Sequence, residues 1–104
     1  MILPRGVAQP AELVKHINAL APFPAGVVNF RYTVENDWSG DPAIFFWITL
    51  SDEAARRDVL SQTSRRIMDF ITERLDPVGH WDLIPYFNFR SQSEQASLKE
   101  EVFG

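Results

Sequence analysis

The chain has 104 residues, no cysteine and a formal net charge of −4. This length suits one domain with a single core, and the lack of cysteine excludes disulfides, thiolate nucleophiles and cysteine-based metal sites. The negative charge disfavours nucleic-acid binding, whose affinity comes largely from neutralising phosphates. No apolar stretch reaches the ~20 residues that span a bilayer, and the N-terminus lacks the features of a signal peptide. We therefore expect a cytoplasmic protein that does not enter membranes.

We expect one domain over residues 1–104, with an N-terminal arm at 1–8 and a helical tail at 91–104. After the arm, apolar residues at helical spacing predict a helix that begins at Pro10, because proline is tolerated in a first turn. Pro22 ends this helix, since proline cannot continue a helix without losing a hydrogen bond.

Two strands should follow. Residues 27–35 alternate between apolar and polar side chains, which predicts a strand with one wet face. Residues 43–50 are apolar on both faces, and a strand of this kind expects cover on both sides. The odd-numbered face of that second strand carries Phe45 and Trp47. The turn-forming residues between the strands predict that the two are antiparallel neighbours.

The next segment predicts the longest helix of the chain, from about Glu53 to Leu75. Ser51 and Asp52 are both suitable N-caps for it, and its apolar arc should lie on the sheet. Asp76, a proline and Gly79 then indicate its end.

A third strand is predicted from about Trp81 to Arg90. Pro85 within it cannot donate to a strand ladder, which favours an edge position or a strand start. Ser91 and Glu94 have the spacing of a capping box, which predicts that a short terminal helix begins there.

These elements predict an α+β protein with the order α-β-β-α-β-(α). A short connection makes the first two strands antiparallel, whereas a crossover through the long helix makes the second and third parallel. The expected architecture is a two-layer α/β sandwich, a three-stranded mixed sheet with helices on one face. This arrangement leaves the face with Phe45 and Trp47 without a partner.

The sequence predicts no catalytic residue, no metal site and no cofactor. His16 and His80 have no partner at metal-ligand spacing, and no Gly-x-Ser-x-Gly elbow is present. The glycines stand singly, so no phosphate-binding loop is indicated. A small enzyme of unknown reaction is a second alternative, and it would need His80, Asp82 and Asp37 to meet in a cleft.

Three kinds of cover are possible for the unpartnered sheet face: the chain's own tail or arm, a second copy, or another ligand. Because a buried Phe or Trp gains roughly 1.5–3 kcal/mol over an exposed one, permanent exposure is disfavoured. We therefore predict a non-catalytic protein-interaction or dimerisation module, either a homodimer or the partner of a second protein. Its expected contact residues are Phe45, Trp47, Trp38, Val102 and Phe103.

The order helix-strand-strand-helix-strand resembles that of KH-type RNA-binding domains of the second topological kind, although the Gly-x-x-Gly loop that clamps RNA is absent. The ribosome-binding factor A family has this architecture without that loop, and its third strand also begins near a proline, as at Ile84-Pro85-Tyr86 here. The resemblance implies an RNA-binding KH-like module as the alternative function. Its expected contacts are Arg31, Arg65 and Arg66.

Overall fold

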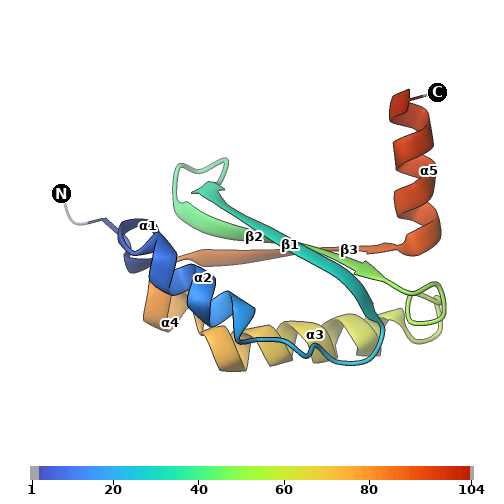
Figure 1. Cartoon of the computed structure of the whole chain (residues 1–104), viewed down its shortest axis with the longest axis horizontal. Coiled ribbons are helices and arrows are strands. Elements are labelled where there is room, and N and C mark those ends of the chain that lie inside the picture. Colours follow the sequence, from blue (N-terminus) through green and yellow to red (C-terminus); the bar gives the residue numbers. More distant parts are fainter. Residues whose placement is uncertain (1–2, 104) are drawn as a thin grey trace.

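The computed structural model describes the backbone of residues 3–103 and the side chains of residues 3–98. A three-stranded sheet lies at its centre, with helices on one side and a last helix that projects from the other (Figure 1). The elements are α1 (Arg5–Ala8), α2 (Pro10–Asn18), β1 (Val27–Asn36), β2 (Pro42–Leu50), α3 (Leu60–Leu75), α4 (Pro77–Trp81), β3 (Ile84–Ser91) and α5 (Gln92–Phe103). The predicted α+β class and element order are confirmed.

The sheet has the predicted mixed topology. β2 is the central strand and pairs antiparallel with β1 and parallel with β3. Thr33, Phe45 and Tyr86 are aligned across the three strands, so their side chains share one face. Pro85 lies on an edge strand, as the missing N–H of proline predicts.

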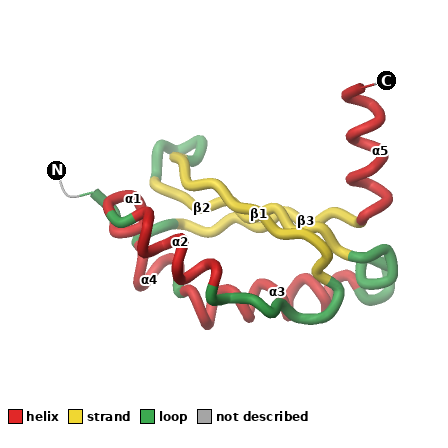
Figure 2. The backbone as a smooth tube through the Cα atoms, in the orientation of Figure 1, coloured by secondary structure: helices red, strands yellow, loops and turns green. Residues whose placement is uncertain are grey.

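The hydrophobic core lies between the sheet and α2, α3 and α4 (Figure 2). Phe46 is fully buried at its centre, and its ring stacks on Phe87 at a centroid distance of 5.2 Å. Ile67 and Ile71 of α3 supply the helical side, as the apolar arc predicts. The even-numbered residues of β2 are therefore the ones that the helices cover.

The long helix begins later than the predicted residue 53, at Leu60. Ser51 starts a separate turn instead, because its hydroxyl accepts the N–H of Ala54 at 3.2 Å. Asp52 does not cap α3. Ser51 caps only this single turn, which is not continued into α3, and the Asp52 carboxylate binds Ser93 instead, so the predicted helix start was wrong.

A short helix, α4, occupies the segment where the sequence indicated a loop. Asp76 ends α3 in the left-handed conformation, with φ of 49°, and its carboxylate accepts the N–H of Gly79 at 3.1 Å. Pro77 then starts α4 at a position where its missing N–H has no cost. The predicted third strand at Trp81 is therefore corrected: Trp81 ends α4 in the core, and the strand begins at Ile84.

The N-terminal arm also forms a short helix, α1, which contacts α2 and α4. Gly6 lies so close to Leu83 that a Cβ atom would have no space. The described part of the arm is thus held on the helical side, away from the opposite face of the sheet.

Candidate protein-interaction face

The sheet face opposite the helices, called the open face below, carries the alternate side chains of all three strands. The strand register places twelve residues on it: Asn29, Arg31, Thr33, Glu35, Ala43, Phe45, Trp47, Thr49, Ile84, Tyr86, Asn88 and Arg90. Aromatic side chains occupy its centre, and most of the side chains around them are polar or charged, with Ala43 and Ile84 beside Glu35. Protein contact surfaces often combine an apolar centre with a polar rim.

Four aromatic rings form a continuous row on the open face. Phe45 stacks on Tyr86 with centroids 5.0 Å apart and on Trp47 with centroids 6.0 Å apart. Trp38, from the β1–β2 hairpin, lies 5.2 Å from the Tyr86 ring and is 81% exposed. The structure thus brings together three residues predicted as contacts and adds Tyr86, and we call these four the aromatic row.

The charges of the open face are divided between its two ends. Near α5, the Arg31 guanidinium lies 4.6 Å from the centroid of the Trp47 ring, a cation–π contact. Arg90 belongs to the same end, one row further toward α5. Toward the hairpin, Glu35 occupies the same face of β1, and Asp37 follows it. One end is therefore basic and the other acidic.

Asp37 fixes the hairpin to the open face. The Tyr86 hydroxyl donates to its carboxylate at 2.8 Å, and the N–H groups of Ser39 and Asp41 donate at 2.9 and 3.0 Å. The hydrogen bond from Tyr86 lowers the pKa of Asp37, and the same bond raises the pKa of Tyr86. Near neutral pH the carboxylate therefore stays ionised and the phenol stays protonated, so the pair holds structure and is not poised for proton transfer.

The start of α5 is fixed by two sets of hydrogen bonds. The predicted capping box is confirmed: Glu94 N–H donates to the Ser91 hydroxyl at 3.1 Å, and Ser91 N–H donates to the Glu94 carboxylate at 3.5 Å. Asp52 accepts from the Ser93 hydroxyl at 2.6 Å and from the Ser93 N–H at 3.0 Å. These bonds lower the pKa of Asp52, with the hydroxyl as the larger cause. The direction in which α5 leaves the sheet is thus determined by its first turn.

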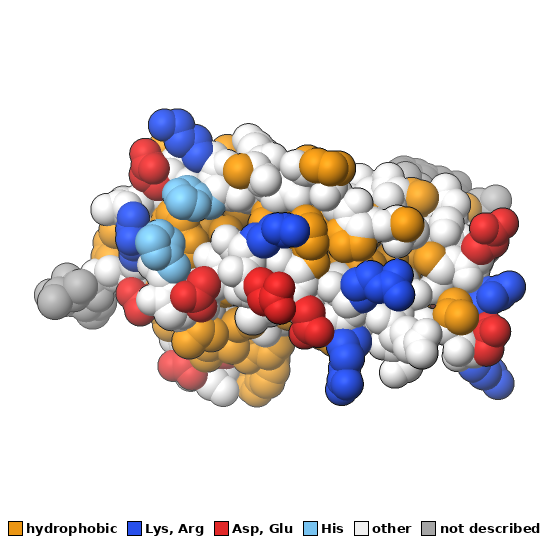
Figure 3. Space-filling view, turned by 90° about the horizontal axis from the view of Figure 1, so that it is seen from below, with side chains coloured by type: hydrophobic (Ala, Val, Ile, Leu, Met, Phe, Trp, Pro, Cys, Tyr) orange, Lys and Arg blue, Asp and Glu red, His pale blue; other side chains and the backbone are white. Residues whose placement is uncertain are grey.

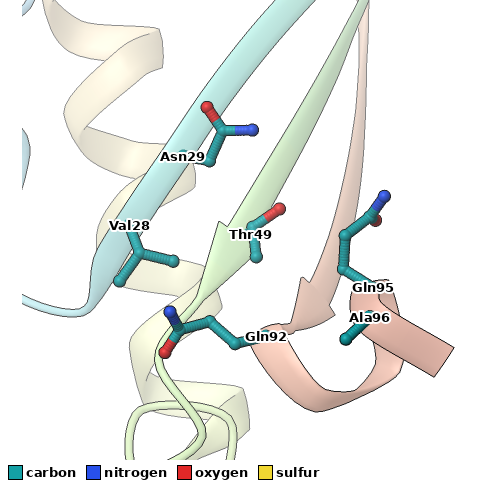
Figure 4. Close-up of a pocket in the computed structure, with 6 residues that line it drawn as sticks. All are labelled: Val28, Asn29, Thr49, Gln92, Gln95 and Ala96. Atoms are coloured by element: carbon teal, nitrogen blue, oxygen red, sulfur yellow. The ribbon is translucent and has the colours of Figure 1, made fainter. Parts of the chain in front are cut away.

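α5 projects away from the sheet on the side of the open face (Figure 1). A pocket of about 290 Å³ lies between its first turn and the ends of β1 and β2 (Figure 4). The pocket is lined by Val28, Asn29, Thr49, Gln92, Gln95 and Ala96. These are aliphatic, hydroxyl and amide groups, so its described lining offers hydrogen bonds but no acid, base or thiol.

The described side chains of α5 lie at this end of the open face, where Gln95 also lines a small pocket with Arg31 and Trp47. The contacts of α5 in the sheet are with β2 and β3, and the aromatic row extends away from it toward the hairpin. The predicted contact residues Val102 and Phe103 lie outside the residues whose side chains are described. Within residues 3–98, the side chains of α5 therefore leave part of the aromatic row uncovered.

Arg31 and the other two arginines of the RNA-binding alternative lie on different sides of the molecule. Arg31 is on the open face, whereas Arg65 and Arg66 occupy exposed positions on α3. On the helical side, basic and acidic side chains are interspersed and form no single basic stripe (Figure 3). The three arginines therefore do not share one surface.

The structure also pairs two histidines that the sequence left separate. His16 of α2 and His80 of α4 have ring centroids 5.8 Å apart, and each ring makes a T-shaped contact with the ring of buried Trp81. His80 is thus on the helical side, while Asp37 is on the open side. The two residues therefore do not meet in one cleft, as the enzyme alternative requires. Among the described residues, no group of three or more His, Asp or Glu could hold a metal ion.

No protein-family model matches the chain, and no curated protein or solved structure matches it significantly. None of the helices within residues 3–103 is long and apolar enough to cross a membrane.

Proposed function

We propose that the protein is a non-catalytic contact module whose open face binds a protein surface, either a second copy of the chain or a different protein. The observation that supports this is the aromatic row. Phe45, Trp47 and Tyr86 are only half-buried, and Trp38 is largely exposed, although all four belong to one continuous surface. Contiguous exposed apolar patches of this kind mark binding sites.

The apolar side-chain area that remains exposed in the aromatic row is large enough for its burial to drive association. At ~25 cal/mol per Å², completing the burial of each half-buried ring gains about 1 kcal/mol, and burying Trp38 gains about 2 kcal/mol. Each copy would thus contribute about 5 kcal/mol. The free energy gained by burying two such faces exceeds the lower estimates of the entropic cost of association, which is ~4–15 kcal/mol. We therefore expect reversible binding with a modest affinity.

The charges around the aromatic row favour a protein over a polyanion. Arg31 at one end is balanced by Glu35 and Asp37 at the other. A phosphate backbone that followed the row would meet both carboxylates, which repel it. A protein surface can supply charges of both signs.

Sedimentation equilibrium over a series of protein concentrations tests the proposal. The wild type should self-associate or, when monomeric, show low solubility that Phe45→Ser/Trp47→Ser relieves. Val78→Ser is the matched control, because Val78 is 61% exposed on the helical side. A strict monomer whose solubility and stability are unchanged in the double variant would remove the proposal.

An RNA-binding module is the alternative, and one observation favours it. Arg31 on Trp47, followed by the stacked Phe45 ring, is a surface on which unpaired bases could stack. Titration with single-stranded RNA across a salt series tests this alternative. Affinity that rises at low salt and is lost in Trp47→Ser would support it, and no measurable affinity at low salt would end it.

A further inference from the structure

The charges of the open face are arranged so that a second copy, rotated by 180°, would be complementary to it. The open face is basic beside α5 and acidic beside the hairpin, with the aromatic row between. We propose that its occupant is a second copy of the chain, stacked face to face with its strands antiparallel to those of the first. The two-fold axis crosses the strands at the row of Thr33, Phe45 and Tyr86. This inference rests on the proposed function, because it names the partner of the same face.

Charge complementarity selects this arrangement over the other face-to-face packing. Arg31 and Glu35 are each two residues from Thr33 along β1, in opposite directions and on the same face. Rotation about the proposed axis places Arg31 over Glu35 of the second copy, and symmetry makes this contact twice. An axis parallel to the strands would instead bring β1 over β3, with Arg31 at the end that holds Arg90 of the second copy. Arg31 would then lie over Asn88 of the second copy and one row from its Arg90, so like charges would be close to each other, which is unfavourable.

The length of α5 fits the same arrangement. Its 12 residues span about 18 Å at 1.5 Å per residue, whereas stacked sheets are about 10 Å apart. Because α5 projects on the open side, it extends past the layer that a second sheet would occupy (Figure 1). The helix would therefore lie along the end of the second copy's sheet.

The end that α5 meets is the hairpin of the second copy. Along β3, Ser91 is five residues from Tyr86, or about 17 Å, on one side of the axis. Along β1, Asp37 is four residues from Thr33, or about 13 Å, on the other side. After rotation the first turn of α5 lies directly beyond the second copy's hairpin, where Trp38 is 81% exposed. This contact would cover Trp38, which its own chain leaves exposed within the described residues.

The area of the face explains why α5 is needed. Eight residues of three strands cover about 27 by 14 Å, or roughly 400 Å² per copy. Stable complexes bury about 800 Å² per partner. The two symmetric contacts between α5 and the hairpin would supply much of the difference.

Charge exchange between two variants tests the arrangement. Arg31→Glu and Glu35→Arg should each weaken self-association about tenfold or more, because each puts like charges at both symmetric contacts. An equimolar mixture should associate as tightly as the wild type, because every contact in the mixed dimer pairs Glu with Arg. Arg31→Gln is the control for the lost cation–π contact: mixed with Glu35→Arg it restores only one of the two Glu–Arg contacts, so it should recover less affinity than Arg31→Glu does.

A cross-link gives a second readout. Trp38→Cys and Ala96→Cys introduce the only thiols into a chain without cysteine. Within one copy these two positions lie at opposite ends of the sheet, so a short bis-maleimide that joins the two variants reports a contact between copies. Efficient joining of Trp38→Cys to Ala96→Cys in a mixture supports the antiparallel arrangement.

The outcomes separate the two proposals. If Phe45→Ser/Trp47→Ser abolishes a wild-type dimer but the charge variants do not complement each other, the antiparallel arrangement is wrong and the open face is still an interface. If a wild-type dimer survives Phe45→Ser/Trp47→Ser, association uses a strand edge or another surface, and both proposals fail. If the wild type is a strict monomer, the second copy is excluded as the occupant.

Discussion

Phe45 and Phe46 are a matched pair for testing which sheet face belongs to the core. They are the same residue type, adjacent on β2 and directed to opposite faces, so effects on strand propensity and on the unfolded chain largely cancel. Phe46 is fully buried and contacts Phe87 and Phe30, with centroids 5.2 and 5.7 Å away. Phe46→Ala should therefore cost about 3–5 kcal/mol, the usual loss for a large ring in a core. Phe45→Ala leaves no enclosed cavity, and we expect it to cost about 1 kcal/mol.

Thermal unfolding at high dilution measures these losses in the monomer. For a domain of this size, about 4–8 °C of Tm corresponds to 1 kcal/mol, so Phe46→Ala should lower Tm by more than about 12 °C and Phe45→Ala by only a few degrees. Repeating the scans at high concentration should raise the Tm of the wild type by mass action, but not that of Phe45→Ala. Equal losses at high dilution, or a concentration dependence that Phe45→Ala retains in full, would refute the reasoning.

Three further changes have expected outcomes. Thr33→Val should raise the free energy of unfolding by about 1 kcal/mol in urea denaturation, because the Thr33 hydroxyl is buried without a hydrogen-bond partner among the described residues; a clear decrease would contradict this. The lowered pKa of Asp37 contributes stability that is complete above the ordinary value of 3.8 and is lost as the pH falls through the folded-state value. Tyr86→Phe removes the largest cause of that shift, so its unfolding midpoint should depend less on acid pH than the wild type's, and an identical pH profile would show that the bond does not matter. Asp52→Ala removes two hydrogen bonds to Ser93, so amide exchange at the start of α5 should accelerate while exchange in α3 is unchanged; no difference would mean that the capping box alone holds the turn.

Patterns that repeat along a single element predicted the fold well. The alternation in residues 27–35 and the doubly apolar run at 43–50 gave two strands with correct facing, because side-chain direction in a strand depends only on residue parity. Pro85 indicated the edge strand through its missing N–H, and the capping box at Ser91 placed the start of the last helix.

Features that depend on contacts between distant segments could not be predicted in this way. Tyr86 joins the aromatic row because the parallel register aligns it with Phe45, and nothing in either strand alone specifies that register. Asp52 looked like a helix cap, but its carboxylate binds Ser93, which lies far along the chain. The pairing of His16 with His80 arises from the packing of two helices around Trp81.

The three tryptophans allow the most direct test of the claim that the open face meets a second copy. Trp38 and Trp47 belong to the aromatic row, whereas Trp81 is fully buried in the helical core and serves as an internal control. In protein labelled with 5-fluorotryptophan, ¹⁹F NMR over a dilution series should show the Trp38 and Trp47 signals shifting with concentration while the Trp81 signal stays constant. Signals of Trp38 and Trp47 that do not change, over concentrations at which sedimentation detects a dimer or up to the limit of solubility, would contradict the claim.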